Sequence, residues 1–417
     1  MTPPSVPELI RVFGRIGLLS FGGPAAQISL MHEELVEKRP WLDEHTYLQA
    51  LSLCMLLPGP EAMQLATYAG WRLRGVPGGL IAGTLFVLPG AIVIGALVWL
   101  YARFGDLPFV QAGFLGVKAT VIVIVIQALR NLSRRALTSG ESKLIALFGF
   151  LTIFALQLPF PVIILSAAVW GYLRLDGGQS SVSGISSPQT NPVRTCLIWI
   201  TLWLTPLFLL SIAGAKLLSD LGWFFARLAV VTFGGAYAVL AYMTQTVVQR
   251  YEWITTNQMI DALGLAETTP GPLILVTQFV AMLTGQTTAG LPLALAAGIV
   301  ALWATFVPCF LWIFLTAPYL DQLAARPGLS AALHGTTAAV VGVILNLSLW
   351  FALHVFFTDV TEIAWGLVRL PWPASNTLNI SALILTVFAG VLIFRFKFGM
   401  GKTLALMAIA GVGTYFL

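Results

Sequence analysis

The stretch Arg15-Ile-Gly-Leu-Leu-Ser-Phe-Gly-Gly23 recurs 212 residues later as Arg227-Leu-Ala-Val-Val-Thr-Phe-Gly-Gly235. At the same offset, Pro58-Gly59-Pro60 aligns with Pro270-Gly271-Pro272. Chance could supply one of these matches, but it does not readily supply both at one spacing. The sequence therefore indicates two tandem copies of one structural unit. Further along, the offset is 219, as three aligned pairs show: Pro89 with Pro308, Ala112 with Ala331, and Gly116 with Gly335.

The composition indicates the class of protein. Hydrophobic residues make up 58% of the 417 positions and charged residues 9%, whereas a soluble domain carries about 25% charged residues. Apolar runs of about 20 residues, long enough to cross a bilayer, recur at 80–100, 109–128, 195–217 and 291–317. In lipid, only helices and closed barrels satisfy the hydrogen bonds of the backbone. A barrel would show segments of about 10 residues in which apolar and polar residues alternate. Because these runs are continuous, the sequence predicts an all-α polytopic membrane protein.

The chain divides into four parts by sequence. Residues 1–175 form the first repeat and residues 218–417 the second. Between them, residues 176–194 are polar and rich in Ser, Gly and Pro, which indicates a flexible linker. The apolar run 195–217 has no counterpart in the first copy, so we expect a transmembrane helix that bridges the repeats. Residues 1–8 lack a basic region and a cleavage site, so we expect no signal peptide.

The basic residues suggest a topology of about six spans per repeat plus the bridge. We expect a cytoplasmic N-terminus and a single crossing by residues 45–73, as a helix broken at Pro58-Gly59-Pro60. Fourteen Lys and Arg residues then lie in cytoplasmic segments and five in external ones, which agrees with the positive-inside rule. The five external residues are Lys38, Arg39, Arg103, Lys216 and Arg369. The second repeat starts outside, so the sequence predicts inverted repeats, a recurrent plan of secondary transporters. Residues 176–193 and 395–402 should face the cytoplasm, and residues 358–372 the outside.

The glycines and prolines of the repeated motifs interrupt helices within apolar spans. Such breaks expose backbone N–H groups, and a half-helix that begins there points its positive end into the membrane. This arrangement suits an oxyanion, which offers only acceptor oxygens. The alternative is that the glycines permit close helix packing. The predicted binding residues are Arg15, Ser20, Gly22, Gly23, Pro24, Pro58, Gly59, Pro60, Gln64, Arg227, Thr232, Gly234, Gly235, Thr268, Thr269, Pro270, Gly271 and Pro272.

Charged residues near or within the spans are candidates for ligand or proton binding. Arg15 and Arg227 occupy equivalent positions and could hold an oxyanion by bidentate hydrogen bonds, or reach lipid headgroups instead. Glu61 and Glu267 flank the Pro-Gly-Pro motifs and are predicted proton carriers, although either could cap a half-helix. Lys118 is an in-span cation whose counterpart is Thr337, so the second repeat does not copy it.

Other motifs exclude alternatives. The cluster His32-Glu33-Glu34 lacks the HExxH spacing of zinc proteases and indicates a solvated external mouth, with pH sensing as the alternative. Residues 398–403 resemble the end of a phosphate loop, but Phe396 stands where its first glycine is required. The three cysteines show no metal spacing. We therefore expect no metal, no cofactor and no nucleic-acid partner, and transport that depends on ion gradients. Nor do the spans contain a nucleophile–base cluster, which argues against a membrane-embedded enzyme.

The motifs Phe21-Gly-Gly-Pro24, His32-Glu-Glu34, Trp41-Leu-Asp43 and Leu57-Pro-Gly-Pro60 resemble those of the chromate ion transporter family. Phe233-Gly-Gly235 and Pro270-Gly-Pro272 match its long, two-domain form. The resemblance implies a chromate-resistance antiporter of the bacterial inner membrane, with antiparallel halves, chromate export and proton coupling. Glu61 departs from the small or polar residue that often follows Pro-Gly-Pro in the family, which leaves uptake or exchange of sulfate or another oxyanion as the alternative. A scaffold and a homodimer also stay open.

Overall fold

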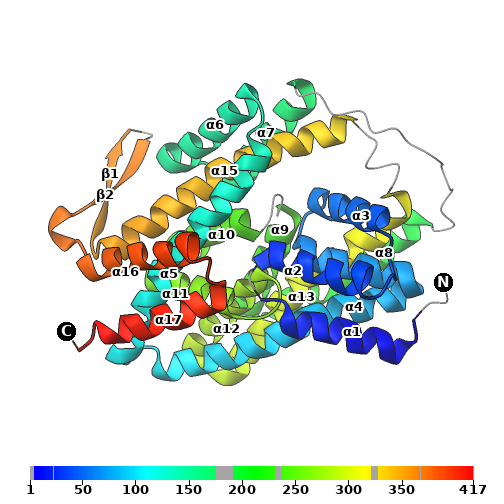
Figure 1. Ribbon diagram of the computed structural model, residues 1–417, viewed down its shortest axis with the longest axis horizontal. Helices are drawn as coiled ribbons and strands as arrows, with labels where there is room; N and C mark the ends of the chain where they lie inside the picture. The colour runs from blue at the N-terminus through cyan, green and yellow to red at the C-terminus, as the bar shows by residue number, and fades with distance from the viewer. Residues whose placement is uncertain are drawn as a thin grey trace. The chain divides into compact units, whose positions relative to one another are not determined.

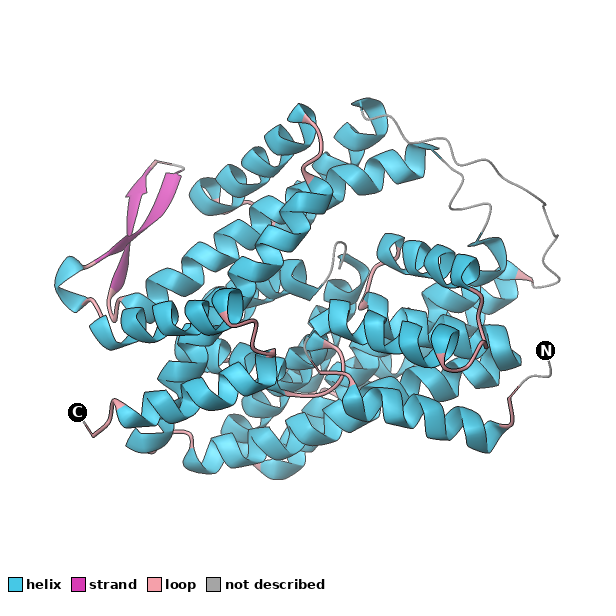
Figure 2. Cartoon of the chain, in the orientation of Figure 1, coloured by secondary structure: helices cyan, strands magenta, loops and turns pink. Residues whose placement is uncertain are grey.

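The computed structural model describes residues 4–21, 23–174, 191–231, 236–320, 327–366 and 368–416. Within these residues the chain forms sixteen α-helices and one two-stranded sheet (Figures 1 and 2). Short π-helical segments extend α2, α10 and α16 to Glu37, Arg250 and Arg395. The helices are α1 (Val6–Leu19), α2 (Gly23–His32), α3 (Glu44–Leu56), α4 (Glu61–Phe104), α5 (Pro108–Ala136), α6 (Gly140–Leu156), α7 (Phe160–Arg174), α8 (Pro192–Ile212), α9 (Lys216–Val231), α10 (Ala236–Thr244), α11 (Thr256–Thr268), α12 (Val276–Ala289), α13 (Leu291–Thr316), α15 (Pro327–Phe356), α16 (Ile380–Gly390) and α17 (Met400–Gly413).

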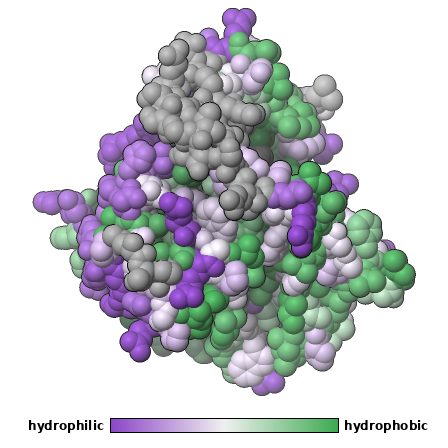
Figure 3. All heavy atoms as spheres, turned by 90° about the vertical axis from the view of Figure 1, so that its right-hand side faces the viewer, coloured by the Kyte–Doolittle hydropathy of each residue, from purple (hydrophilic) through white to green (hydrophobic). Residues whose placement is uncertain are grey.

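Five of the described helices are long and apolar enough to cross a membrane: Glu61–Phe104, Pro108–Ala136, Pro192–Ile212, Leu291–Tyr319 and Ala331–Phe356. Many of their large apolar side chains point outward, as do those of shorter helices; Ile92 is 64% exposed and Ile409 is 70% exposed. Figure 3 shows hydrophobic side chains gathered into broad areas of one face. Apolar surface of this extent is expected where lipid is the solvent. The helical membrane class is thus confirmed.

A β-hairpin interrupts the helical pattern near the C-terminal end. Strands β1 (Val360–Trp365) and β2 (Val368–Pro373) pair antiparallel, from Val360 opposite Pro373 to Trp365 opposite Val368. Gly366 lies between them with φ +64°, a conformation that glycine adopts without strain. The sequence predicted only a loop here, so the expected all-α fold is incomplete at this one segment.

The packing of the chain follows two compact units rather than the two sequence repeats. Unit 1 comprises Met1–Trp99, Gly178–Ala236 and Thr269–Pro327, and unit 2 comprises Leu100–Gly177, Tyr237–Thr268 and Gly328–Leu417. Each unit therefore takes residues from both copies of the repeat. In unit 1, α13 packs against α8, α9 and α12; in unit 2, α5 packs against α11, α16 and α17.

The first break, in unit 1, reverses the chain instead of interrupting a single crossing. Nη1 of Arg15 in α1 lies 3.9 Å from Oε1 of Glu34, which follows α2. If α1 and α2 were collinear, the 19 residues between these positions would span about 28 Å at 1.5 Å per residue. No pair of side chains bridges that distance. The two helices are therefore the arms of a hairpin whose tip lies between Leu19 and Gly23.

The second break in unit 1 forms another hairpin. The start of α3 lies beside α2, since Tyr47 donates to the carbonyl of Ile28 over 2.6 Å. At the other end, α4 is kinked at Arg74 and Gly75. Residues 61–73 fold back on the rest of the helix, since a Cβ at Gly70 would meet the carbonyl oxygen of Gly78. The side chain of Arg74 donates to the carbonyl of Pro4, just before α1. Both arms thus return to the end of unit 1 where the chain begins. These contacts favour a hairpin of residues 45–73 over the single crossing that the sequence predicts.

Candidate substrate site

The tip of the first hairpin touches the second Pro-Gly-Pro motif within unit 1. The backbone N–H of Gly271 donates to the carbonyl of Ser20 over 2.9 Å. The side-chain amide of Gln27 joins the same two residues, donating to the Ser20 carbonyl at 3.2 Å and to the Gly271 carbonyl at 2.7 Å. Gly23 and Gly271 have φ values of +79° and +88°, which favour glycine at both turns. Two breaks that are far apart in sequence, at Ser20 and Gly271, are therefore in direct contact.

Gln27 is the residue that sequence analysis missed at this contact. It is 1% exposed, and its counterpart at the repeat offset is Val239. Its orientation is fixed, since exchanging the amide oxygen and nitrogen would place an oxygen against two carbonyl oxygens. The remaining oxygen, Oε1, is buried and has no hydrogen-bond partner among the described residues. A single amide within an apolar run was the available signal.

The two Pro-Gly-Pro motifs make reciprocal contacts with the opposite repeat. A Cβ at Gly90 in α4 would lie 2.1 Å from the carbonyl oxygen of Pro270. A Cβ at Gly59 would lie 3.1 Å from Sγ of Cys309 in α13. The repeat offsets align Gly59 with Gly271 and Gly90 with Cys309. Each motif therefore packs against the equivalent point of the other copy.

The first Pro-Gly-Pro is held by its own helix. Nε2 of Gln64 donates to the carbonyl of Pro58 over 2.7 Å, and Oε1 of Gln64 is buried without a partner among the described residues. Pro60 directly precedes α4, and Glu61 is the first residue of that helix. A carboxylate in the first helical turn is stabilised by the helix dipole, so its position suits a cap as well as a proton carrier.

The second carboxylate, Glu267, lies in unit 2 at the end of α11. It is 6% exposed, and Oε1 accepts a hydrogen bond of 2.8 Å from the hydroxyl of Tyr237. Sequence analysis did not single out Tyr237. Thr268 Oγ1 donates to the carbonyl of Leu265 within the same helix, and Thr269 is buried.

The two predicted arginines lie on equivalent helices of unit 1 but have different surroundings. The Arg15 side chain is half exposed and faces Glu34, whose carboxylate also accepts hydrogen bonds from Lys38 at 3.1 Å and Arg39 at 2.5 Å. Nε of Arg227 donates to the carbonyl of Trp223, one turn earlier in α9. Thus Arg15 belongs to a cluster of three cations around one buried carboxylate. The predicted binding residues Gly22, Thr232, Gly234 and Gly235 lie outside the described residues.

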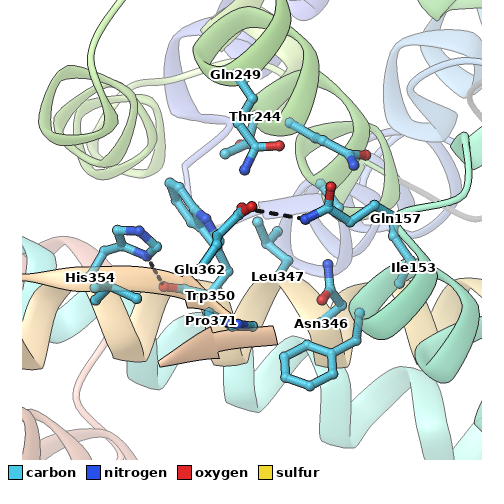
Figure 4. Close-up of a pocket in the computed structure, with 14 residues that line it drawn as sticks. Ile153, Gln157, Thr244, Gln249, Asn346, Leu347, Trp350, His354, Glu362 and Pro371 are labelled. Atoms are coloured by element: carbon cyan, nitrogen blue, oxygen red, sulfur yellow. Dashed lines mark hydrogen bonds between the residues drawn. The ribbon is translucent and has the colours of Figure 1, made fainter. Parts of the chain in front are cut away.

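Unit 2 contains a polar pocket of about 120 Å³ (Figure 4). Gln157 follows α6, Gln249 lies in the π-helical extension of α10, and Glu362 lies on β1; all three line the pocket. Figure 4 shows Glu362 pointing toward Gln157, whose amide donates to it over 3.3 Å. Thr244 also lines the pocket, is 4% exposed, and has a hydroxyl without a partner among the described residues. The pocket therefore brings the end of α10 beside the α6–α7 turn and the β-hairpin.

The chemistry of these sites suits binding and release rather than bond cleavage. The described residues hold no group of three or more His, Cys, Asp or Glu that could bind a metal ion. Half-helices that meet at glycine-rich breaks expose backbone donors and acceptors within a helical bundle, as secondary transporters do. The fold and site thus define a multi-pass membrane transporter.

Comparison with known proteins gives the family. The model described as Chromate transporter matches residues 7–172 and 219–415, so the chain belongs to the chromate transporter family and is not an enzyme. A chromate transport protein of Cupriavidus metallidurans is 33% identical over 352 residues, 81% of this chain and 80% of the relative. One from Pseudomonas aeruginosa is 30% identical over 411 residues, 94% of this chain and 93% of the relative. No solved structure matches.

Proposed function

We propose that this protein exports chromate across the bacterial inner membrane, driven by an ion gradient and coupled to protons as an antiporter. The observation that carries the proposal is the contact of Ser20 and Gln27 with Gly271, since it joins the two helix breaks at which the sequence predicts oxyanion binding. The family supports chromate as the cargo. Sulfate, which shares chromate's tetrahedral shape and double charge, is the second candidate.

The hairpins of unit 1 support an inverted-repeat topology with nine spans: residues 76–104, α5, α6 and α7 in the first repeat, α8 as the bridge, and α13, α15, α16 and α17 in the second. By the repeat, we propose that the segment of the second copy that aligns with the first hairpin also returns to the membrane face from which it starts. Lys38 and Arg39 then move to the cytoplasmic group, and Arg250 moves to the external group. Fifteen basic residues face the cytoplasm and four face outside, a sharper asymmetry than the predicted crossings give.

The pocket of unit 2 supports this assignment independently. It joins Gln249, next to Arg250, to Gln157 and Glu362. A crossing by α10 would place Gln249 on the cytoplasmic face, about 30 Å of hydrocarbon away from the other two. With a re-entrant α10, all three lie on the outer face.

Single cysteines test the topology in a variant without Cys54, Cys196 and Cys309. The hairpin assignment expects Glu37→Cys to be labelled only from the cytoplasmic side and Gln249→Cys only from outside. Lys402→Cys and Trp365→Cys serve as controls, since both topologies place them inside and outside respectively. Labelling of Glu37→Cys from outside would restore the single crossing.

Transport is tested in proteoliposomes with chromate, sulfate, molybdate and phosphate, with and without a pH gradient. We expect chromate exchange in the absence of a gradient, and chromate accumulation when the inside is more acidic. A preference for sulfate over chromate would favour the second candidate. Absence of exchange with every oxyanion would refute the proposed function.

A further inference from the structure

A buried ion pair in unit 2 involves neither of the Pro-Gly-Pro motifs. Nζ of Lys118 in α5 is 3.1 Å from Oδ1 of Asp261 in α11. The other carboxylate oxygen, Oδ2, accepts a hydrogen bond of 2.8 Å from the hydroxyl of Tyr101, near the end of α4. Asp261 is 0% exposed and Lys118 is 8% exposed. Three helices thus meet at one carboxylate.

Close packing of α11 against α5 brings this cluster together. Gly264 lies one turn after Asp261, and a Cβ there would be 2.5 Å from Cγ1 of Val117, the neighbour of Lys118. Of the other helices, α17 also contacts α11. Its one titratable side chain is Lys402, which is exposed. Within the described residues, Lys118 and Tyr101 are therefore the titratable groups that face Asp261.

The cluster joins Tyr101 and Lys118 of the first repeat to Asp261 of the second, and the aligned positions do not reproduce it. The repeat offsets align Lys118 with Thr337, Asp261 with Gln49, and Tyr101 with Leu320. A buried ion pair is weak support for stability, since the cost of removing both charges from water offsets their attraction. Charges within membrane helices usually serve transport, because lipid makes them expensive to keep.

We propose that Asp261 binds and releases a proton in each transport cycle, while Lys118 and Tyr101 stabilise its ionised form. This inference rests on the proposed proton-coupled transport and adds a site separate from Glu61 and Glu267. Proton uptake converts the carboxylate to a neutral acid and removes its attraction to Lys118, so the link between α11 and α5 weakens. Proton release restores the link.

The position of Asp261 connects this event to the candidate substrate site. The same helix, α11, ends at Thr268, and the chain runs directly into Pro270-Gly271-Pro272. Movement of α11 on α5 is therefore transmitted along the backbone to the motif that contacts Ser20. The coupling runs through a continuous segment of chain and needs no separate relay.

The decisive variant removes both charges together, Asp261→Asn with Lys118→Met, since removal of one alone would leave an uncompensated buried charge. The matched control is Glu141→Gln with Lys143→Met, which removes an exposed pair of the same charges from α6. We expect the Asp261 double variant to exchange chromate close to the wild-type rate, but to lose accumulation driven by a pH gradient and proton flux reported by a trapped pH dye. The control should keep both.

Tyr101→Phe is the milder test, because it removes one hydroxyl and no charge. That hydroxyl stabilises the ionised carboxylate, so its loss should move the midpoint of the pH–rate profile upward while chromate exchange continues. A structural pair would leave the midpoint unchanged. Gradient-driven accumulation that persists in the double variant would overturn the inference. If the wild-type protein exchanges chromate without pH-driven accumulation, the inference on Asp261 is also overturned, but chromate transport stands. Absence of chromate exchange would refute both the proposed function and the inference.

Discussion

Replacement of Gln27 tests whether the contact between the two breaks matters for transport. Gln27→Leu removes the donor to the Gly271 carbonyl, and the described residues show no other donor to it. The Ser20 carbonyl keeps the N–H of Gly271. A buried acceptor left unsatisfied costs about 1–3 kcal/mol. If that cost falls on the substrate-binding state, half-saturation should need about fivefold to 150-fold more chromate.

The assay is initial chromate exchange at a series of concentrations in proteoliposomes, with protein yield and thermal stability as measures of folding. Gln27→Glu separates hydrogen bonding from packing. It preserves the shape, but its carboxylate offers no donor and faces two carbonyl oxygens, so it should be worse than Gln27→Leu. Thr284→Val is the control, since Thr284 is buried and its hydroxyl donates to the carbonyl of Val280 in its own helix. Wild-type half-saturation in Gln27→Leu, or better transport by Gln27→Glu than by Gln27→Leu, would refute the reasoning.

Three further outcomes follow from local geometry. Gly90→Ala should destabilise the fold by about 1–3 kcal/mol, since its Cβ would overlap the Pro270 carbonyl. Gly95→Ala on the same helix should be tolerated, because the nearest described atom outside its own helix is Nε2 of Gln278 at 3.8 Å. Equal thermal stability of the two variants would contradict this. Arg15→Lys and Arg227→Lys should each raise the chromate concentration for half-saturation about tenfold to a hundredfold if the arginines bind the oxyanion. A lost charge-assisted hydrogen bond costs about 1.5–3 kcal/mol. Wild-type kinetics in both variants would instead make the arginines membrane anchors. Asp43→Ala should destabilise the start of α3 by about 1 kcal/mol. Hydrogen bonds from the backbone and hydroxyl of Thr46 lower the pKa of Asp43, so its stabilising contribution is lost as pH falls through that lowered pKa. The difference in melting temperature between Asp43→Ala and wild type should therefore shrink below about pH 3.9.

The duplication and the helix breaks could be predicted because short sequence motifs show both. The direction of the chain after a break could not be predicted. A half-helix that continues across the membrane and one that turns back have the same apolar composition. Two successive hairpins leave the chain on the face where it started, and so do two successive crossings. Every segment from Arg72 to Lys216 therefore keeps its predicted face under either topology. Only Lys38, Arg39 and Arg250 distinguish the two, and three charges among nineteen are too few to decide.

Side-chain partners were harder to predict than breaks. Lys118 was visible as a charge in an apolar run, but nothing local identifies Asp261, 143 positions later, as its partner. Gln27 and Tyr237 are each a single polar group near a glycine-rich motif, and their roles depend on contacts with distant backbone or with Glu267. The predicted arginine pair illustrates the converse. Equivalent positions in the repeat do not ensure equivalent surroundings, because Glu34, which faces Arg15, aligns with Thr246.

The reciprocal packing of the motifs explains why both copies are needed for one site. Pro270 of the second repeat needs the space above Gly90 of the first, and Gly59 of the first lies against Cys309 of the second. The asymmetry between Gly90 and Cys309 means that one contact is backbone against backbone and the other is backbone against a side chain. The first is the tighter of the two, and it adjoins the contact that Gln27 makes. If the two motifs alternate in holding the substrate, the contact of Pro270 with Gly90, beside Gln27, should be the more rigid. Cys309→Gly should loosen the contact at Gly59 and leave the contact of Pro270 with Gly90 unchanged.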